Sequence, residues 1–242
     1  MKKFFAVLFS VLIVVSIFSA CGKTKSGGSG DDSDKVYTEG DYDYTILEDG
    51  TAKIIGFHNT KNYDELSIPA KFEKDSDETS SSEAETEAAV TNEASESTET
   101  VKEDNGIPVT VIGEGAFENV TGIEYVKFSK NLVEIEKRAF AGSSIKNAIM
   151  VSSRKLTKIG EEAFADCKSL VQIDIPSSVV DFGARCFANA TSLVVISFRG
   201  NQENIDNSIF EGSSSFRICT YEKNNNIKDF AKANDYELKI IG

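Results

Sequence analysis

The sequence predicts an α/β-type curved solenoid, in which short parallel strands alternate with helical or 3₁₀ return segments. The first observation is an aromatic residue that recurs at intervals of 23, 24, 23 and 23 residues. These aromatics are Phe117, Phe140, Phe164, Phe187 and Phe210. The second observation is a triplet of mostly apolar residues at relative positions 0, 3 and 5 after each aromatic. Five units at one period are hard to obtain by chance, so we expect each unit to form one turn of a stack.

Each triplet is expected to supply a short strand whose apolar side chains continue a column through the core. The triplets are Ile123, Val126 and Phe128; Ile145, Ala148 and Met150; Leu170, Ile173 and Ile175; Leu193, Ile196 and Phe198; and Phe216, Cys219 and Tyr221. A further column lies five residues before each aromatic, at Ile112, Ile135, Ile159, Phe182 and Ile205. A period of 20–29 residues with this spacing is typical of a leucine-rich repeat solenoid.

Residues between the core positions of each strand should point away from the core and form one exposed strip. The predicted strip is Tyr125, Lys127, Asn147, Ile149, Gln172, Asp174, Val195, Ser197, Ile218 and Thr220. Four members are apolar or aromatic, which is unusual for a solvated face and indicates a surface that binds another macromolecule. The alternative is that β-branched residues simply suit strands. Both interpretations stay open at this point.

The N-terminus carries an export signal. Lys2 and Lys3 precede an apolar stretch of 15 residues, Phe4 to Phe18, which is short for a bilayer span of roughly 20 residues and typical of a signal peptide. The stretch ends in FSACG and resembles the lipobox of bacterial lipoproteins, with Phe18 where that family usually has Leu. The resemblance implies that Cys21 is lipidated and begins the mature chain. An ordinary secretory signal and an uncleaved anchor are the alternatives.

The negative charge of the chain is concentrated in one segment. The net charge is −13, and residues 73–104 alone hold 12 acidic and 2 basic side chains. This segment has too few apolar residues to bury a core, so we expect a disordered insertion within one repeat. The predicted organisation is a lipoprotein signal peptide at 1–20, a flexible tether at 21–35, an N-terminal cap with the start of the first repeat at 36–72, the acidic insertion at 73–104, the repeats at 105–221 and a C-terminal cap at 222–242.

Both ends of the repeat region predict caps that cover the exposed core. The segment YDYTILEDGTAKIIGF, Tyr42 to Phe57, looks like two paired strands joined by a turn at LEDGT. At the other end Ile227, Phe230 and Ala231 lie at helical spacing and predict a short amphipathic helix. The stretch YELKII that follows predicts a final strand.

The sequence contains few residues that could form a catalytic, metal-binding or nucleotide-binding site. His58 is the only histidine, so a His-dependent nucleophile triad is not expected. Cys167, Cys186 and Cys219 lack the paired spacing of a zinc site and are expected to be buried free thiols that pack as small apolar residues. Nucleotide-binding glycine motifs and basic clusters are missing. We therefore expect no enzyme activity, cofactor, metal ion or nucleic-acid partner.

Two stretches, VTVIGEGAFENVTGIEYVKF and LTKIGEEAFADCKSLVQIDIPSSVVDFG, resemble bacterial surface leucine-rich repeats of the BspA type. Ile175-Pro176 and Ala163-Phe164 with Cys167 match the most distinctive part of that family's repeat. The resemblance covers residues 105–221. It implies a lipid-anchored, extracytoplasmic cell-surface protein that binds a protein or glycoprotein of host, matrix or bacterial origin, as in adhesion. A structural envelope lipoprotein without a specific ligand and a carbohydrate-binding surface lipoprotein are the alternatives.

Overall fold

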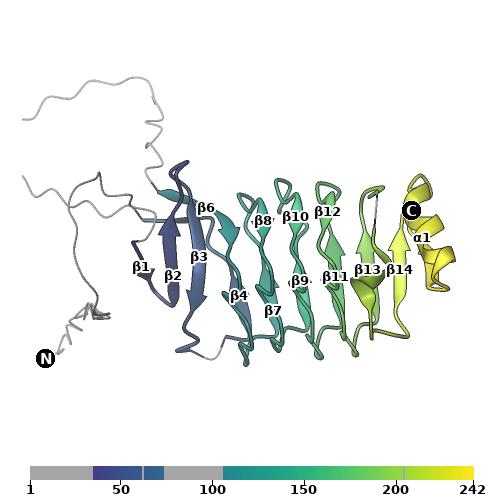
Figure 1. The fold of residues 1–242 in the computed structure, drawn as a ribbon, viewed down its shortest axis with the longest axis horizontal. Coiled ribbons are helices and arrows are strands. Elements are labelled where there is room, and N and C mark those ends of the chain that lie inside the picture. Colours follow the sequence, from purple (N-terminus) through teal and green to yellow (C-terminus); the bar gives the residue numbers. More distant parts are fainter. Residues whose placement is uncertain (1–34, 62, 74–105, 204) are drawn as a thin grey trace, which may run out of the picture. The chain divides into compact units, whose positions relative to one another are not determined.

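The fold is a β-solenoid of about six turns with little helix. The computed structural model describes residues 35–61, 63–73, 106–203 and 205–242. The predicted signal peptide, Cys21 and nearly all of the tether and of the acidic insertion lie outside the described residues. In Figure 1 the strands follow one another from β1 at one end to β14 and α1 at the other. Each regular turn contributes one strand to each of two sheets.

The seven-stranded sheet is built from the predicted strands, and all of its neighbouring strands are parallel. Its order is β15-β14-β13-β11-β9-β7-β4. The strands are β4 (Glu65–Ser67), β7 (Tyr125–Lys127), β9 (Asn147–Ile149), β11 (Gln172–Ile175), β13 (Val195–Phe198), β14 (Arg217–Thr220) and β15 (Glu237–Ile240).

The eight-stranded sheet holds the N-terminal cap and the return segments. Its strands are β1 (Tyr37–Glu39), β2 (Tyr42–Ile46), β3 (Ala52–Phe57), β5 (Lys71–Phe72), β6 (Ile107–Ile112), β8 (Glu134–Ile135), β10 (Lys158–Ile159) and β12 (Asp181–Phe182). The antiparallel pairing of β2 with β3 confirms the predicted strand pair. β3, β6, β8, β10 and β12 then continue in parallel. β5 pairs antiparallel with β6, which holds the two chain segments on either side of the insertion together.

The return segments contain less helix than the sequence predicted. In one of them, Glu162 has φ 53° and Asp166 has φ 57°, and only a single turn of chain separates them. Left-handed residues cannot continue a right-handed helix, so the turn ends after Ala163, Phe164 and Ala165. The same pairs recur at Gly115 and Asn119, Arg138 and Gly142, and Arg185 and Asn189. The last return segment forms the 3₁₀ helix η2 (Asn207–Phe210), with the Asp206 carboxylate accepting from the Ser208 N–H.

The predicted aromatic column is confirmed as a continuous stack. The centroids of successive rings from Phe117 to Phe210 are 4.7, 5.1, 5.7 and 5.7 Å apart, and all five rings are buried. Stacked aromatic pairs at such distances contribute beyond the burial of their area. Phe57 of β3 adds a rung that the sequence reading missed, with its centroid 5.0 Å from that of Phe117. The cap is therefore packed into the same column as the repeats.

An ion ladder runs along the outside of the return segments. Arg138 lies between two carboxylates, with nitrogen–oxygen distances of 2.7 Å to Glu118 and 2.7 Å to Glu162. Arg185 continues the ladder to Glu162 at 3.4 Å and to Glu211 at 2.6 Å. Hydrogen bonds to Glu118 and then Glu162 raise the pKa of Arg138. Because these groups are partly exposed, we expect each pair to contribute about 1 kcal/mol or less.

The register of β14 corrects the predicted strip. Ile218 pairs with the core residue Ile196, Thr220 pairs with the core residue Phe198, and both Ile218 and Thr220 are fully buried. The outward positions are held by Arg217 and Cys219 instead. The reason is a one-residue deletion, since Arg217 lies 7 positions after Phe210, whereas Val195 lies 8 positions after Phe187. A shift of one residue exchanges the two faces of a strand.

The C-terminal cap agrees with the prediction. The helix α1 (Asn225–Ala233) buries Ile227, Phe230 and Ala231 against the last repeat. β15 then pairs in parallel with β14 and closes the seven-stranded sheet on this side. The helix covers core side chains that the stack would otherwise expose at its end, as a solenoid requires.

Candidate functional site

The outward side of the seven-stranded sheet forms a regular grid of two rows, set by the parallel register. The first row is Glu65, Tyr125, Asn147, Gln172, Val195, Arg217 and Glu237. The second row is Ser67, Lys127, Ile149, Asp174, Ser197, Cys219 and Lys239. We call these residues the outer face. Eight of the ten predicted strip residues lie on it, and Ile218 and Thr220 do not.

The middle of the outer face is hollowed. A depression of about 240 Å³ is lined by Tyr125, Asn147, Ala148, Ile149, Gln172 and Asp174. Tyr125 is 38% exposed at its edge. Apart from Ala148, whose side chain is buried in the core, the lining therefore combines one aromatic and one aliphatic side chain with two amides and a carboxylate. Such a mixture suits a partner that offers both apolar contact and hydrogen-bonding groups.

Most charged groups on or beside the outer face are paired with one another. The Lys127 ammonium lies 2.6 Å from the Glu65 carboxylate, and Arg217 lies 2.6 Å from Glu237. Just before the strands, Lys146 and Glu124 form a third pair. Because these charged groups form ion pairs with one another, they do not give the outer face an electrostatic potential of a single sign. Recognition is left mainly to the apolar and amide groups between them.

An apolar patch lies beside the hollow, between two of these ion pairs. Val171 and Val194 directly precede β11 and β13, and the Val194 N–H donates a hydrogen bond to the Val171 carbonyl at 2.9 Å. Val194 is 55% exposed, and Val195 continues the patch onto the outer face. The sequence reading missed Val171 and Val194 because they stand outside the alternating strand pattern. Contiguous exposed aliphatic side chains of this kind mark interaction surfaces.

The repeat geometry agrees with a match to a family of known proteins. A family model for the BspA-type leucine-rich repeat region matches residues 94–217 in six copies. The chain belongs to the BspA-type leucine-rich repeat family. A comparison with curated proteins gave no significant match.

Two solved structures resemble this BspA-type chain. A leucine-rich cell surface protein from Faecalibacterium prausnitzii has a TM-score of 0.52 at 21% identity, with 81% of this chain and 47% of that chain covered. The pneumococcal vaccine antigen PcpA has a TM-score of 0.51 at 16% identity, with 78% of this chain and 51% of that chain covered. At these identities the likeness shows the fold. The chain spans about half the length of these two relatives.

In the part of this BspA-type chain that the structure describes, the three thiols, Cys167, Cys186 and Cys219, are free and buried, as predicted. Burial raises the pKa of the Cys167 thiol to about 11 and also raises that of Cys186. Cys219 was expected in the core and instead lies on the outer face, where burial again raises its pKa. Protonated thiols are poor nucleophiles.

The single histidine belongs to a structural network in the N-terminal cap. His58 Nε2 lies 2.6 Å from a carboxylate oxygen of Asp43. Nearby, the buried Asp41 accepts hydrogen bonds from the Thr60 and Tyr63 hydroxyls at 2.5 and 2.7 Å. Burial opposes ionisation of Asp41, but these two hydrogen bonds together with nearby charge, including that of Lys61, lower its pKa overall. The network fixes the loop after β3 onto the cap.

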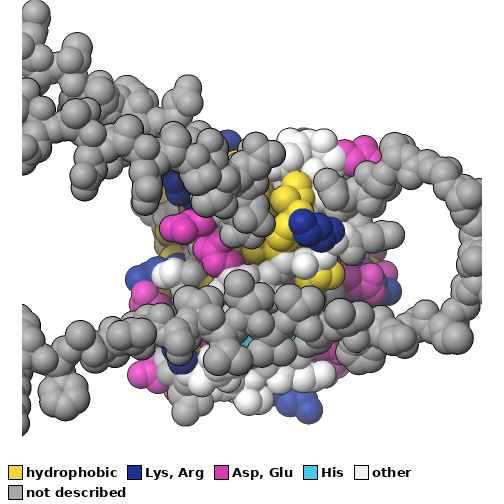
Figure 2. Space-filling view, turned by 90° about the vertical axis from the view of Figure 1, so that its left-hand side faces the viewer, with side chains coloured by type: hydrophobic (Ala, Val, Ile, Leu, Met, Phe, Trp, Pro, Cys, Tyr) yellow, Lys and Arg dark blue, Asp and Glu magenta, His cyan; other side chains and the backbone are white. Residues whose placement is uncertain are grey.

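The described residues contain neither a metal-binding group nor a membrane-spanning helix. Among residues 35–61, 63–73, 106–203 and 205–242, no group of three His, Cys, Asp or Glu side chains is placed to hold a metal ion. In the same part of the chain no helix is long and apolar enough to cross a membrane. Seen from the β1 end, the visible described side chains include hydrophobic residues and charges of both signs (Figure 2).

Proposed function

We propose that this chain is an extracytoplasmic cell-surface protein whose outer face binds a protein or glycoprotein partner, as in adhesion. The observation that carries the proposal is the apolar patch of the exposed Val171 and Val194 and the half-buried Val195, beside the hollow at Tyr125. Protein interfaces commonly place an apolar, aromatic-rich centre inside a polar rim. The ion pairs at Lys127 and Arg217 lie where such a rim would be.

The length and stiffness of the outer face support the same function. Seven parallel strands at roughly 4.8 Å spacing give a face about 29 Å long. Its strands are three or four residues long, so the face is about 10–13 Å wide and supplies roughly half of the about 800 Å² that a standard interface buries on each partner. A partner that spans this length would therefore also contact residues beside the strands, such as Val171 and Val194. Hydrogen bonds to a neighbouring strand on either side fix the backbone of each inner strand of the face. The aromatic stack beneath the sheet supports it further. A rigid surface loses little conformational freedom when a partner binds.

The proposed location rests on the relatives and on the N-terminal sequence. One solved relative is described as a cell surface protein and another as a vaccine antigen. For this chain we propose export by the signal peptide at 1–20 and lipidation of Cys21, followed by the tether at 21–35. Each buried CH₂ of an acyl chain contributes about 0.8 kcal/mol, so two or three chains hold a protein at a membrane. Labelling with radioactive palmitate tests this, because Cys21→Ser must abolish the label; a label that persists in this variant refutes the anchor.

The binding proposal is tested with two matched triple variants. The first places Glu at Tyr125, Ile149 and Val195 on the outer face. The control places Glu at Val133, Thr157 and Val180, which precede strands of the eight-stranded sheet and are exposed, whereas Ile149 and Val195 are half-buried. Both proteins are compared with the unmodified chain for melting temperature and for retention of partners from membrane extracts and immobilised matrix glycoproteins.

The first triple variant is expected to lose the retained partner at an unchanged melting temperature, whereas the control keeps it. Equal retention by both variants would contradict the proposal. If the unmodified chain retains nothing, the chain is better described as a structural envelope lipoprotein. If free sugars or deglycosylation of the extract release the partner, the chain binds carbohydrate.

A further inference from the structure

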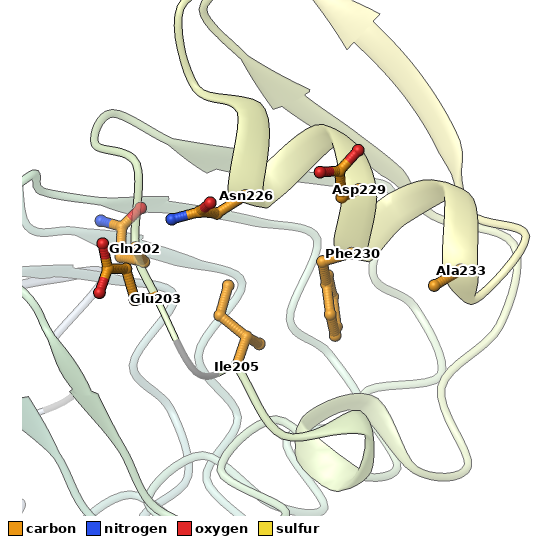
Figure 3. Close-up of a pocket in the computed structure, with 7 residues that line it drawn as sticks. All are labelled: Gln202, Glu203, Ile205, Asn226, Asp229, Phe230 and Ala233. Carbon is orange, nitrogen blue, oxygen red and sulfur yellow. The ribbon is translucent and has the colours of Figure 1, made fainter.

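A second hollow lies in the C-terminal cap, away from the outer face. It has a volume of about 500 Å³ and separates the segment that follows β13 from the helix α1 (Figure 3). Its lining residues are Gln202, Glu203, Ile205, Asn226, Asp229, Phe230 and Ala233. The hollow is therefore formed where the last regular turn of the solenoid meets its cap.

Gln202 presents a buried hydrogen-bond acceptor here. Its side chain is only 3% exposed, and its Nε2 donates to the Pro176 carbonyl at 3.1 Å. Gly200 makes room for this amide, because a Cβ at that position would lie 3.0 Å from Gln202 Nε2. Since the nitrogen is engaged with Pro176, the orientation of the amide is fixed. Its Oε1 is buried without a hydrogen-bond partner, and in Figure 3 it is turned toward Asn226.

The charged groups around this acceptor are carboxylates. Glu203 and Asp229 line the hollow, and its lining holds neither Lys nor Arg. Two nearby cations are engaged elsewhere, since Lys228 binds Glu222 at 3.0 Å and Arg199 lies 3.4 Å from Asp174, and Lys232 in the last turn of α1 forms no ion pair with Asp229. Among the described residues, Glu203 and Asp229 form no ion pair with a cationic side chain. The hollow thus offers acceptors and negative charge without a matching cation.

The rest of the hollow is apolar and held in place. Ile205 and Phe230 provide hydrophobic lining, and the Phe230 ring packs 6.3 Å from Phe210 and 5.9 Å from Tyr236. The Asn226 N–H donates to Asn201 Oδ1 at 2.8 Å, which ties the helix to the opposite side. The hollow is therefore formed before any ligand binds, which favours affinity.

We propose that this hollow binds the cationic end of a lysine or arginine side chain of a partner protein. The ammonium or guanidinium donates hydrogen bonds and has no acceptor, which matches the Gln202 oxygen and the carboxylates of Glu203 and Asp229. The aliphatic stem of either side chain packs against Ile205 and Phe230, as the stems of Lys and Arg do on apolar surfaces. The inference stands apart from the outer face and does not depend on it.

The test uses small probes that carry only the side chain in question. The ¹⁵N-labelled full chain, solubilised in detergent, is titrated with Nα-acetyl-lysine methylamide and with Nα-acetyl-arginine methylamide and followed by NMR. Saturable shifts are expected at residues 201–203 and in the helix α1. The uncharged Nα-acetyl-norleucine methylamide should bind at least tenfold more weakly. Which cation binds more tightly identifies the side chain that the hollow prefers.

Carboxylate-to-amide variants inside and outside the hollow distinguish binding in the hollow from general attraction to surface charge. The double change Glu203→Gln with Asp229→Asn should weaken cation binding at least fivefold. The control Asp235→Asn removes a carboxylate outside the hollow and should leave binding unchanged; Asn tolerates the φ of 56° at that position. Absence of saturable shifts, equal shifts with norleucine, or unchanged binding by the double variant would overturn the proposal. The outer-face triple variant should bind these probes normally, so the two proposals can fail separately.

Discussion

Phe164 gives the sharpest test of the aromatic stack. Its side chain is 0% exposed and lies in the middle of the column, with its ring centroid 5.1 Å from that of Phe140 and 5.7 Å from that of Phe187. A buried Phe→Ala change typically costs about 3–5 kcal/mol of unfolding free energy. Because Phe164→Ala also breaks two stacked pairs, we expect about 4–5 kcal/mol. Against a total stability of about 5–15 kcal/mol, this loss is large.

The assay is urea unfolding of the unmodified chain and its variants, followed by circular dichroism. Phe164→Leu keeps most of the apolar volume and should cost about 1–2 kcal/mol. Val180→Ala changes an exposed side chain and should alter the free energy of unfolding by less than about 0.5 kcal/mol. A loss below about 2 kcal/mol for Phe164→Ala, with an unchanged slope against urea, would refute the idea that the column is one continuous core.

Three further predictions use the same unfolding assay. Ile218→Ala should cost about 2–5 kcal/mol, whereas Arg217→Gln should cost less than about 1 kcal/mol; the opposite order would show that the register of β14 is wrong. The buried Cys167 thiol keeps its proton up to a pKa of about 11, while in the unfolded chain it ionises near 9. Stability should therefore fall as pH rises from 9 to 11, by about 2–3 kcal/mol more in the unmodified chain than in Cys167→Ala, and parallel pH curves would contradict this. Arg138→Gln should cost about 0.5–1 kcal/mol at low salt and less at 1 M NaCl, and a loss that salt does not change would show that the ion ladder is not electrostatic.

The aromatic stack could be predicted because the stacking of turns requires the same kind of residue at a regular interval in the sequence. Phe117 and its counterparts recur because one turn cannot bury its own apolar edge and must match the next. The return segments were less predictable. Their single helical turns end at residues with positive φ. Glu162 is one of these residues, and Glu is not a residue type that signals a left-handed conformation. Phe57 was missed because it belongs to the cap and follows no period.

The candidate site was predictable only in part. Alternation along each strand places Tyr125 and Gln172 on the outer face, and the structure agrees. In β14 both Ile218 and Cys219 are apolar enough for the core, so a one-residue deletion could not be located from residue types. Val171 and Val194 lie before the strands, where alternation gives no guidance. The orientation of the Gln202 acceptor depends on the hydrogen bond to Pro176, which only the folded chain brings close.

Site-specific photo-cross-linking on intact cells tests most directly whether the outer face is the binding surface. A benzophenone side chain is placed at Gln172 on the outer face in one protein and at Asp181, on β12 of the eight-stranded sheet, in another. Both positions are outside the core, so both proteins should fold and reach the same location. We predict cross-linked adducts from position 172 and none from position 181. Adducts from position 181 alone, or equal adducts from both positions, would contradict the assignment of the outer face as the binding surface.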